Sequence, residues 1–429
     1  MAAQLQRRGV VGAQLVIVND GAVVLSRNYG EARKAGAKVT DDTAFAIGSI
    51  TKQFVCAAAL ALEQEGTLSL DDLVSAYYPG LTRAKEITLD DLGTHRSGYP
   101  DYYPLDFLDR RMMTPIEPDA LLDRYAKAPL DFDPRTRWSY SNTGFVVLGR
   151  VIEKVGGVPL AEQLRRRLFA LAAMDDASFD PPNDVPGLAH GHAHFALGDA
   201  EPIQREARGW IHAAGGIYAS AGDLARWDLA LVDGKILRPP GMKKLTTPRK
   251  LADGRSTEYG CGIGVRQIGG ETVWSHSGAV SGFLAYNTVV PRTRSAVVLL
   301  VNTEGSSVGE LHQEIVQLLV APAVNVPVVA GPAADVVARE LLAQLQSGKL
   351  ERDQLGAELS HYYDDARLRG AAERLRALGT PTRVEAGKPR ERGGMEVTNI
   401  TFTFATRNMK AMLYRTPDGI VQEFLLLHD

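Results

Sequence analysis

Two blocks of strand-forming sequence, far apart in the chain, place the strongest constraint on its fold. The first block, "QLVIVNDGAVVLS", lies within residues 10–29, where apolar and β-branched residues flank an Asn-Asp-Gly turn signal. This pattern predicts a β-hairpin. The second block, within residues 264–303, contains the stretches "GVRQIGGETVWSHSG", "GFLAYNTVVP" and "SAVVLLVNT". Since strands must pair to satisfy their backbone groups, the two blocks predict one antiparallel sheet built from both ends of this region.

The chain between these blocks reads as mainly helical. Residues 51–66 and 142–157 carry apolar residues at helical spacing, and both stretches end in glycine, a helix stop signal. A further helical pattern follows the last strand at residues 308–320. We therefore expect an α/β (α+β) fold in which helices flank an antiparallel sheet, with a mainly helical insertion at roughly residues 55–250 and a cleft between the two parts.

A domain boundary is expected within residues 321–333, "APAVNVPVVAGPA". This stretch is rich in proline, alanine and valine and lacks charge, which suits a connector. Beyond it, helical patterns are followed by alternating strand patterns and a "TPDG" turn. We expect a first domain over residues 1–322, a linker over 323–333 and a small α+β domain over 334–429. The small domain carries no visible catalytic constellation, and we interpret it as an interaction or cleft-covering module.

Composition and charge narrow the class of partner. The 429 residues include 48 Lys and Arg against 51 Asp and Glu, for a formal net charge of -3. Without a basic field to attract a phosphate backbone, nucleic acid is excluded as a partner, and we expect a small or peptide-like substrate. No run of about 18 apolar residues is present, so no segment is expected to span a membrane. The sequence leaves the oligomeric state open.

The N-terminal stretch and the two cysteines bear on the compartment. The stretch "QRRGVVGAQLVIVNDG" has the basic and apolar parts of a signal peptide, but the turn that ends it favours the hairpin. We expect export to the periplasm if a longer native N-terminus carries a signal, and a cytoplasmic location otherwise. Two cysteines are too few for a disulfide framework or a zinc cluster, so we expect Cys56 to be a small core residue and Cys261 to be buried near the start of a strand.

The stretch "FAIGSITKQF" places Ser49 and Lys52 at the start of a predicted helix, at a spacing that puts both on one helix face. A serine hydroxyl becomes a nucleophile when a base takes its proton, and a lysine amine can be that base once burial lowers its pKa. The start of a helix also offers the Ser49 N–H as a donor to an oxyanion. The alternative is that Ser49 is an ordinary helix N-cap.

A second stretch, "WSYSNTGF", places Tyr140 and Asn142 just ahead of the helix that begins near Asn142. Tyr140 could relay a proton between a nucleophile and a leaving group, and Asn142 could hold Lys52 or a substrate amide. The alternatives are a packed aromatic ring and a helix cap.

A third stretch, "VWSHSGAVSGF", places His276, Ser277 and Gly278 at the end of a predicted strand. Glycine lets a ligand approach the backbone closely, so the Ala279 N–H can be a second oxyanion donor while His276 and Ser277 face a substrate carboxylate or carbonyl. The alternative is a hairpin end with a solvent-facing histidine. Ser281 is a poor nucleophile candidate, because "GAVSG" is one residue too long for the G-x-S-x-G elbow.

These three stretches together resemble the serine hydrolases of the penicillin-binding-protein and class C β-lactamase family. The family order is S-x-x-K, then Y-x-N, then K-T-G or H-x-G, and the chain carries "SITK", "YSN" and "HSG" in that order. The stretches "LGTHRSGYPDYY" and "AAGGIYASAGDLARW" also look familial. The resemblance covers roughly residues 10–320, and it implies a hydrolase domain within residues 1–322.

The resemblance implies a role for each motif residue and a class of reaction. Ser49 would be the acylated nucleophile, Lys52 its proton acceptor, Tyr140 the proton relay, and Asn142 a ligand of substrate and of Lys52. His276 stands where class C β-lactamases usually carry lysine, which favours the D-peptidase and esterase branches. The implied function is a cofactor-free serine hydrolase that cleaves a D-amino-acid peptide or amide, or a small ester. The alternatives are a weak β-lactamase and a non-catalytic penicillin- or peptidoglycan-binding sensor on the same fold.

Two further sets of side chains have both a functional and a structural interpretation. The histidines of "HGHAHF" alternate as metal ligands on a strand could, but no carboxylate or cysteine partner is evident and the surroundings read as loop, so we expect no metal. They are His190, His192 and His194. The tyrosines of "SGYPDYYP" either line the mouth of the cleft or pack the loop. They are Tyr99, Tyr102 and Tyr103.

Overall fold

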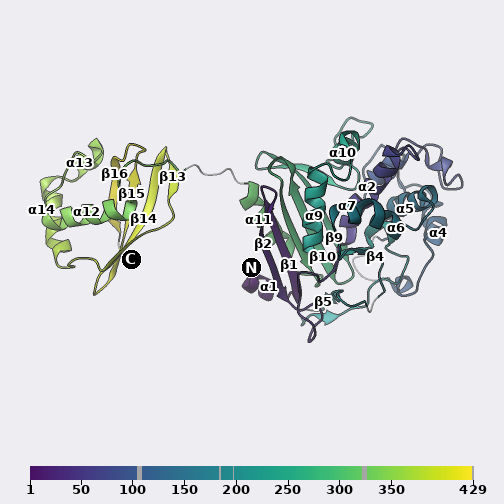
Figure 1. The fold of residues 1–429 in the computed structure, drawn as a ribbon, viewed down its shortest axis with the longest axis horizontal. Helices are drawn as coiled ribbons and strands as arrows, with labels where there is room; N and C mark the ends of the chain where they lie inside the picture. Colours follow the sequence, from purple (N-terminus) through teal and green to yellow (C-terminus); the bar gives the residue numbers. More distant parts are fainter. Residues whose placement is uncertain (104–108, 183–184, 197, 321–325, 428–429) are drawn as a thin grey trace. The chain divides into compact units, whose positions relative to one another are not determined.

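The computed structural model describes the whole chain except residues 104–108, 183–184, 197, 321–325 and 428–429. The chain divides into two compact units, Met1–Ala321 and Pro322–Asp429, and each has a hydrophobic core of its own (Figure 1). Residues 326–333, within the predicted linker, contain no helix or strand, and its first residues, 323–325, lie outside the described residues.

One antiparallel sheet forms the centre of the first unit, which confirms the predicted sheet. Its strands lie in the order β2-β1-β11-β10-β9-β8. Strand β1 pairs with β11, with Ala13 opposite Val301, so the N-terminal hairpin joins the late strands. Asp20 and Gly21 turn the hairpin with positive φ values of 50° and 74°, as a tight turn between twisted strands requires. The strands are β1 Gly12–Asn19, β2 Ala22–Gly30, β8 Gly264–Ile268, β9 Glu271–Val280, β10 Phe283–Val290 and β11 Ser295–Val301.

Helices cover both faces of this sheet, as Figure 1 shows for α9 and α11. Successive side chains of β11 point to opposite faces, so Leu299 packs in the cluster with α11 (Val308–Val320) while Leu300 packs in the cluster with α9 (Ala221–Val232). All of β11 is buried, which explains why "SAVVLLV" is a continuous apolar run instead of an alternating one. The short helix α1 (Ala2–Arg7) joins the α11 side through Leu5.

The predicted helical insertion packs around α2 (Thr51–Gln64), which is buried on nearly every side. Helix α2 contacts α5 (Asn142–Gly156), α8 (His212–Gly215) and α10 (Pro239–Thr246). The remaining helices are α3 Leu89–Gly93, α4 Pro118–Leu121, α6 Leu160–Leu164 and α7 Ala170–Ala172. Small sheets are formed by β3 Phe45–Ala46, β4 Ser178–Phe179 and β7 Ile217–Ala219, and by β5 His192–Ala193 and β6 Glu201–Pro202.

The second unit has the predicted α+β composition. Its sheet has the order β12-β14-β15-β16, and β13 also pairs with β14. The helices pack on one face of the sheet around Phe402 and Phe424. The short elements α13, β12 and β13 were not predicted, because segments of six, four and three residues carry little periodic signal. The elements are α12 Ala334–Ser347, α13 Ala357–Tyr362, α14 Asp365–Arg376, β12 Arg383–Ala386, β13 Arg390–Arg392, β14 Met395–Thr403, β15 Asn408–Arg415 and β16 Val421–Leu427.

The prediction for the two cysteines is wrong in one respect. Cys56 and Cys261 are both buried, as expected, but they form a disulfide across 205 positions of sequence, with Cα atoms 5.6 Å apart. The bond ties α2 to the segment that precedes β8. A Cβ atom at Gly93 would lie 2.5 Å from the Cys261 sulfur, so glycine there leaves room for the bond. Two cysteines this far apart in sequence meet only through the tertiary fold, so their spacing gave no signal.

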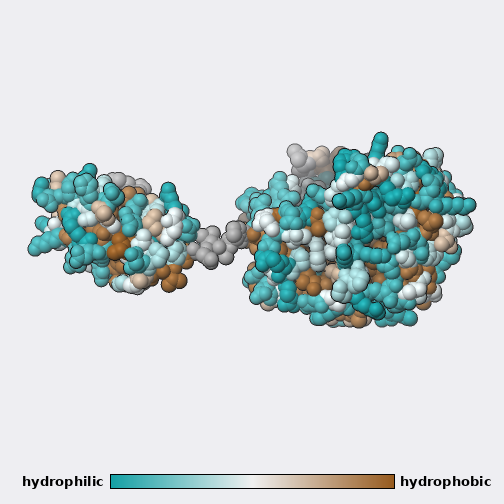
Figure 2. Space-filling view, turned by 90° about the horizontal axis from the view of Figure 1, so that it is seen from above, coloured by the Kyte–Doolittle hydropathy of each residue, from teal (hydrophilic) through white to brown (hydrophobic). Residues whose placement is uncertain are grey.

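The surface agrees with the expectation from composition. The faces visible in Figure 2 are largely hydrophilic, with apolar side chains in small separate patches. In the described part of the chain, no helix has the length and apolar character needed to cross a bilayer.

Candidate active site

Ser49 lies in a short 3-10 turn, Gly48–Ile50, that leads into α2. The N-cap interpretation of Ser49 is wrong, because Ile50 is the N-cap residue of α2 and no side chain caps either helix start. The Ser49 hydroxyl instead lies 3.0 Å from Lys52 Nζ. Gly48 has a positive φ of 50°, and a Cβ atom there would lie 2.9 Å from Ala279 N. Glycine at this position therefore lets the turn approach β9.

Lys52 is fully buried, and its amine contacts three oxygens. Nζ donates to Asn142 Oδ1 at 2.8 Å and to the Ala214 carbonyl at 2.7 Å, and it lies 3.0 Å from Ser49 Oγ. The Tyr140 ring centroid lies 4.8 Å away. Burial lowers the pKa of Lys52 from its ordinary value to about 7, and the negative charge of Asp101 opposes this shift. The amine is therefore substantially neutral near physiological pH.

The three contacts fix the direction in which Lys52 can accept a proton. A neutral amine has two N–H groups and one lone pair. The Asn142 and Ala214 oxygens can only accept hydrogen bonds, so they take the two N–H groups. Ser49 is the one partner of the three with a proton to give, and the lone pair therefore faces its hydroxyl.

Asp101 orients the Asn142 amide. Its carboxylate accepts from Asn142 Nδ2 at 3.2 Å and from the Asn142 backbone N–H at 3.1 Å. With Nδ2 held by Asp101, Oδ1 must face Lys52. The predicted alternative, that Asn142 caps α5, is wrong, because Ser141 is the N-cap and its hydroxyl accepts from the Gly144 N–H. Asp101 lies in the familial stretch "LGTHRSGYPDYY", but its role was not predicted.

His95 holds the chain on both sides of Tyr140. Its carbonyl accepts from the Ser139 N–H at 3.1 Å, its Nδ1 accepts from the Ser141 N–H at 3.0 Å, and its ring lies 4.2 Å from the Tyr140 ring between centroids. Because Nδ1 accepts, the neutral ring carries its proton on Nε2. Burial, reinforced by the charge of Lys52, keeps the pKa of His95 well below its ordinary value. The sequence prediction missed this residue also.

The Tyr140 side chain faces Ser49. Burial raises the pKa of Tyr140 above its ordinary value, while a hydrogen bond with Ser49 acts in the opposite direction. The phenol is therefore protonated at neutral pH. It lies between the Ser49 hydroxyl and the half-buried ring of His276, whose centroid is 6.4 Å from the Tyr140 centroid.

Two backbone N–H groups border a narrow gap between the Ser49 turn and β9. A Cβ atom at Gly278 would lie 1.9 Å from the Ile47 carbonyl oxygen and 3.1 Å from Ser49 N, so only glycine fits there. The Gly48 approach to Ala279 N borders the same gap from the other side. The pairing of β8 with β9 ends at Ser275, which leaves residues 276–280 as an edge beside the turn. The predicted role of the Ser49 and Ala279 N–H groups as oxyanion donors is therefore a proposal that this close approach supports.

His276 and Ser277 point to opposite faces of the sheet. Ser277 pairs with Tyr286, which stacks on His312 of α11, so the Ser277 side chain lies on the α11 face. His276 lies on the face of Ser49 and Tyr140. In the described structure, the Ser277 hydroxyl makes no hydrogen bond with Ser49, Lys52 or Tyr140. The expectation that both side chains face one substrate group overlooked this alternation.

The His276 ring is held by Tyr259, which sequence analysis did not single out. His276 Nε2 lies 2.8 Å from the Tyr259 hydroxyl, and Nδ1 lies 2.6 Å from the Ser277 carbonyl. Tyr259 is buried and lies in "EYGCGIG", where no motif marks it.

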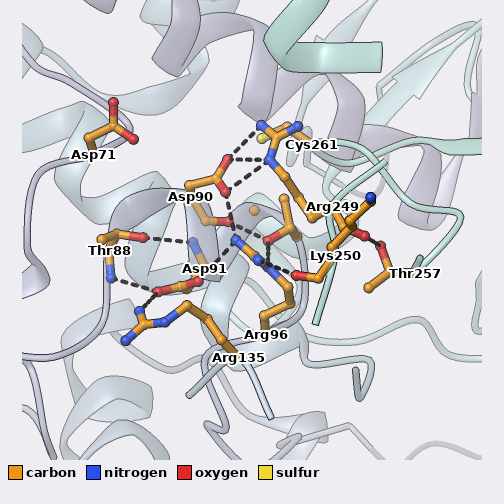
Figure 3. Close-up of polar contacts among 12 residues, drawn as sticks. Asp71, Thr88, Asp90, Asp91, Arg96, Arg135, Arg249, Lys250, Thr257 and Cys261 are labelled. Carbon is orange, nitrogen blue, oxygen red and sulfur yellow. Dashed lines mark hydrogen bonds and ion pairs between the residues drawn. The ribbon is translucent and has the colours of Figure 1, made fainter. Parts of the chain in front are cut away.

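A cluster of buried charges fixes the segments around the site (Figure 3). Asp90 of α3 pairs with Arg96 at 2.8 Å and with Arg249 at 2.7 Å, and the neighbouring Asp91 pairs with Arg135 at 2.5 Å. Each arginine comes from a different loop, so the pairs anchor three loops to one helix. Removing one partner would leave a buried charge without compensation.

The remaining candidate side chains have structural partners. His192 Nδ1 contacts the Asn302 carbonyl and His194 contacts the Gly9 and Gly198 carbonyls, and the described residues contain no group arranged to hold a metal ion. Tyr99 and Tyr102 are buried and pack the loop, with their hydroxyls on the Thr82 and Trp210 carbonyls. Tyr103 and Ser281 both donate to the Glu206 carboxylate.

Comparison with known proteins agrees with this geometry. The family described as "Beta-lactamase" matches residues 1–321. The putative penicillin-binding protein PbpX of Bacillus subtilis is 29% identical over 307 residues, covering 71% of this chain and 74% of that protein. The D-aminopeptidase of Brucella ovis is 30% identical over 306 residues, covering 69% of this chain and 57% of that protein. The structure of the D-amino acid amidase of Ochrobactrum anthropi aligns with a TM-score of 0.64 at 25% identity, over 74% of this chain and 94% of that one.

Proposed function

This chain belongs to the beta-lactamase family, and from that membership we propose that it is a serine hydrolase that cleaves D-amino-acid amides or peptides through an acyl-enzyme on Ser49. The D-aminopeptidase and D-amino acid amidase relatives support this substrate class. The chain spans little more than half the length of the D-aminopeptidase. The substrate class is therefore a proposal that rests on the similarity to these relatives and on the arrangement of the site. Small esters and β-lactams are further acyl donors of the same chemistry.

The arrangement around Lys52 is the observation that carries the proposal. Lys52 Nζ takes the Ser49 proton, and the Ser49 oxygen forms a bond to the substrate carbonyl carbon. The carbonyl oxygen becomes an oxyanion between the Ser49 and Ala279 N–H groups. The Tyr140 hydroxyl passes a proton to the leaving nitrogen and is reprotonated from Lys52, and the C–N bond breaks. Water then attacks the carbonyl carbon of the acyl-enzyme and gives one proton to Lys52, and that proton passes to the Ser49 oxygen as its bond to the acyl carbon breaks and the acid leaves.

Kinetics of a serine variant test the proposal. We expect wild type to hydrolyse D-alanine p-nitroanilide faster than the L-enantiomer, and Ser49→Ala to lose about four to six orders of magnitude in kcat/KM. Ser26→Ala, on the exposed side of β2, is the matched control and should retain wild-type turnover. Equal turnover in wild type and Ser49→Ala would refute the assignment.

A labelled penicillin separates the enzyme from the sensor alternative. We expect the Ser49 adduct with a fluorescent penicillin to form and then to hydrolyse slowly, as followed by mass spectrometry of the intact protein. A stable adduct without product release, together with no turnover of D-amides or esters, would favour a penicillin-binding sensor.

A further inference from the structure

Both ring nitrogens of His276 are occupied by protein groups. A carbonyl oxygen can only accept, so the 2.6 Å contact with the Ser277 carbonyl places the ring proton on Nδ1. Nε2 then accepts from the Tyr259 hydroxyl at 2.8 Å. Burial, reinforced by the charge of Lys52, lowers the pKa of His276 to about 4, and burial keeps the Tyr259 phenol protonated by raising its pKa. The ring is a neutral, fully engaged group at neutral pH.

The position of Tyr259 is itself fixed by the surrounding fold. Its carbonyl accepts from the Arg249 N–H at 3.0 Å, and the Arg249 side chain pairs with Asp90 in the buried charge cluster (Figure 3). The disulfide at Cys261 anchors the chain two residues further on. The Tyr259 ring also packs on His95, with centroids 5.0 Å apart. The phenol is therefore held in place by contacts that do not depend on His276.

The proposed mechanism places His276 on the side of the site from which the leaving group departs. In that mechanism the scissile carbonyl lies between the Ser49 and Ala279 N–H groups, and Tyr140 delivers the proton to the leaving nitrogen. His276 precedes Ala279 on the same strand edge, and its ring lies 6.4 Å from that of Tyr140. A carboxylate on the leaving group would then lie beside His276, whose ring is neutral and already hydrogen-bonded at both nitrogens.

Two cations of the described residues, Lys52 of α2 and Arg266 of β8, lie on elements next to His276, and neither replaces this missing charge. Lys52 donates its N–H groups to the Asn142 and Ala214 oxygens. Arg266 of β8 pairs with Val273 in the sheet, on the α11 face opposite His276, and its guanidinium lies 3.5 Å from the Glu258 carboxylate. A carboxylate that a bound substrate places against this neutral ring would lose part of its hydration without gaining a charged partner, which disfavours binding.

We propose that Tyr259 sets the leaving-group specificity by holding His276 as a neutral ring, so that the enzyme takes substrates with an uncharged leaving group and rejects peptides whose leaving residue carries a free carboxylate. The preferred class is then D-amino-acid amides and arylamides. This inference rests on the proposed function for its kinetic consequences, whereas the state of the His276 ring can be measured independently.

Two substrates with the same acyl group test the kinetic consequence. D-Alanine p-nitroanilide and D-alanyl-D-alanine form the same acyl-enzyme and differ only in the leaving group. We expect the wild-type ratio of kcat/KM to favour the anilide by about 100-fold or more. His276→Lys should narrow this ratio at least about tenfold, whereas His276→Gln, a neutral side chain that can still hydrogen-bond, should keep it. Similar turnover of both substrates by wild type, or an unchanged ratio in His276→Lys, would overturn the inference.

The nitrogen spectrum of the histidine rings tests the inference without turnover. In wild type at pH 7, the two-bond ¹H–¹⁵N correlation of His276, assigned by its loss in His276→Gln, should show a neutral ring protonated on Nδ1. Tyr259→Phe, checked for folding by circular dichroism, leaves the Ser277 carbonyl on Nδ1 and frees Nε2, so a larger fraction of the ring should be protonated than in wild type as the pH is lowered from 7. A protonated ring in wild type at pH 7, or the same protonated fraction in wild type and Tyr259→Phe at each lower pH, contradicts the proposal. Failure of all turnover with the expected spectra would refute the proposed function and leave the ring state established.

Discussion

The charge of Asp101 should set the pH at which the enzyme becomes active, and its removal gives a shift of predictable sign. Lys52 must be neutral to take the Ser49 proton, so kcat/KM should rise with pH and reach its plateau above the Lys52 pKa of about 7. Asp101 raises this pKa, because its negative charge favours the ammonium form. Asp101→Asn removes this charge and so lowers the pKa of Lys52. The rising limb of kcat/KM should therefore move to lower pH.

The structure bounds the size of this shift. The Asn142 amide bridges the two groups, with 2.8 Å from Lys52 Nζ to Oδ1 and 3.2 Å from Nδ2 to the Asp101 carboxylate. The ammonium and the carboxylate therefore lie within about 8 Å of each other. Coulomb's law at that distance gives about 0.5 kcal/mol in water and about 2 kcal/mol at an effective dielectric of about 20. The midpoint of the rising limb should accordingly fall by about 0.4 to 1.5 pH units.

The assay is the pH profile of kcat/KM from pH 5 to 9 with a D-amino-acid anilide, measured for wild type, Asp101→Asn and a control, Glu314→Gln. Glu314 is an exposed residue of α11, so its substitution removes a negative charge away from the site. Loss of the Asn142 orientation would lower the plateau, and loss of the charge would move the midpoint, so the two effects separate. A midpoint that stays with wild type or moves to higher pH would refute the electrostatic reasoning.

Three further changes have expected outcomes that other measurements can check. Burial raises the pKa of Asp228 to about 8, so its protonated form stabilises the folded protein fully below the unfolded pKa of about 4, and the free energy of unfolding falls by about 1.4 kcal/mol per pH unit between about pH 4 and pH 8. Urea unfolding of Asp228→Asn at pH 5 and pH 8 should show a smaller decrease than wild type. An equal decrease in both proteins would contradict this account. His95→Leu should lower kcat about tenfold or more with little change in KM because Tyr140 loses its support, and His95→Asn, which keeps an acceptor, should recover part of it. Replacing Cys56 and Cys261 by alanine should lower the free energy of unfolding by about 3 to 5 kcal/mol at nearly constant activity, and a loss under about 1 kcal/mol would contradict this account.

The periodic parts of the fold could be predicted from the sequence. The hairpin, the late strands and the helices that begin near Thr51 and Asn142 all follow from apolar spacing and turn signals that persist over many residues. The same signals predicted the second unit as helices followed by alternating strands. The disulfide could not be predicted, because the sequence alone does not show which distant segments become neighbours in the fold.

The contact between Ser49 and Lys52 could be predicted for a different reason. The spacing of Ser49 and Lys52 at the start of a helix encodes their contact locally, so geometry follows once the helix is placed. The residues that hold them were not predictable. Asp101, His95 and Tyr259 come from irregular loops, and each acts through a hydrogen bond to a residue far away in sequence, which leaves no periodic trace.

The neutral state of Lys52, which it needs in order to accept a proton, is consequently a property of the whole fold and not of the S-x-x-K motif alone. Burial of α2 on nearly every side removes water from the amine and lowers its pKa, and the Asp101 carboxylate opposes that shift through the Asn142 amide. Burial also lowers the pKa of His276, and the charge that Lys52 carries when protonated lowers it further. The site that keeps its lysine neutral by burial thus also favours a neutral histidine, and Tyr259 adds a hydrogen bond to His276 Nε2. The proposed reactivity and the proposed preference for an uncharged leaving group therefore share burial as a physical cause.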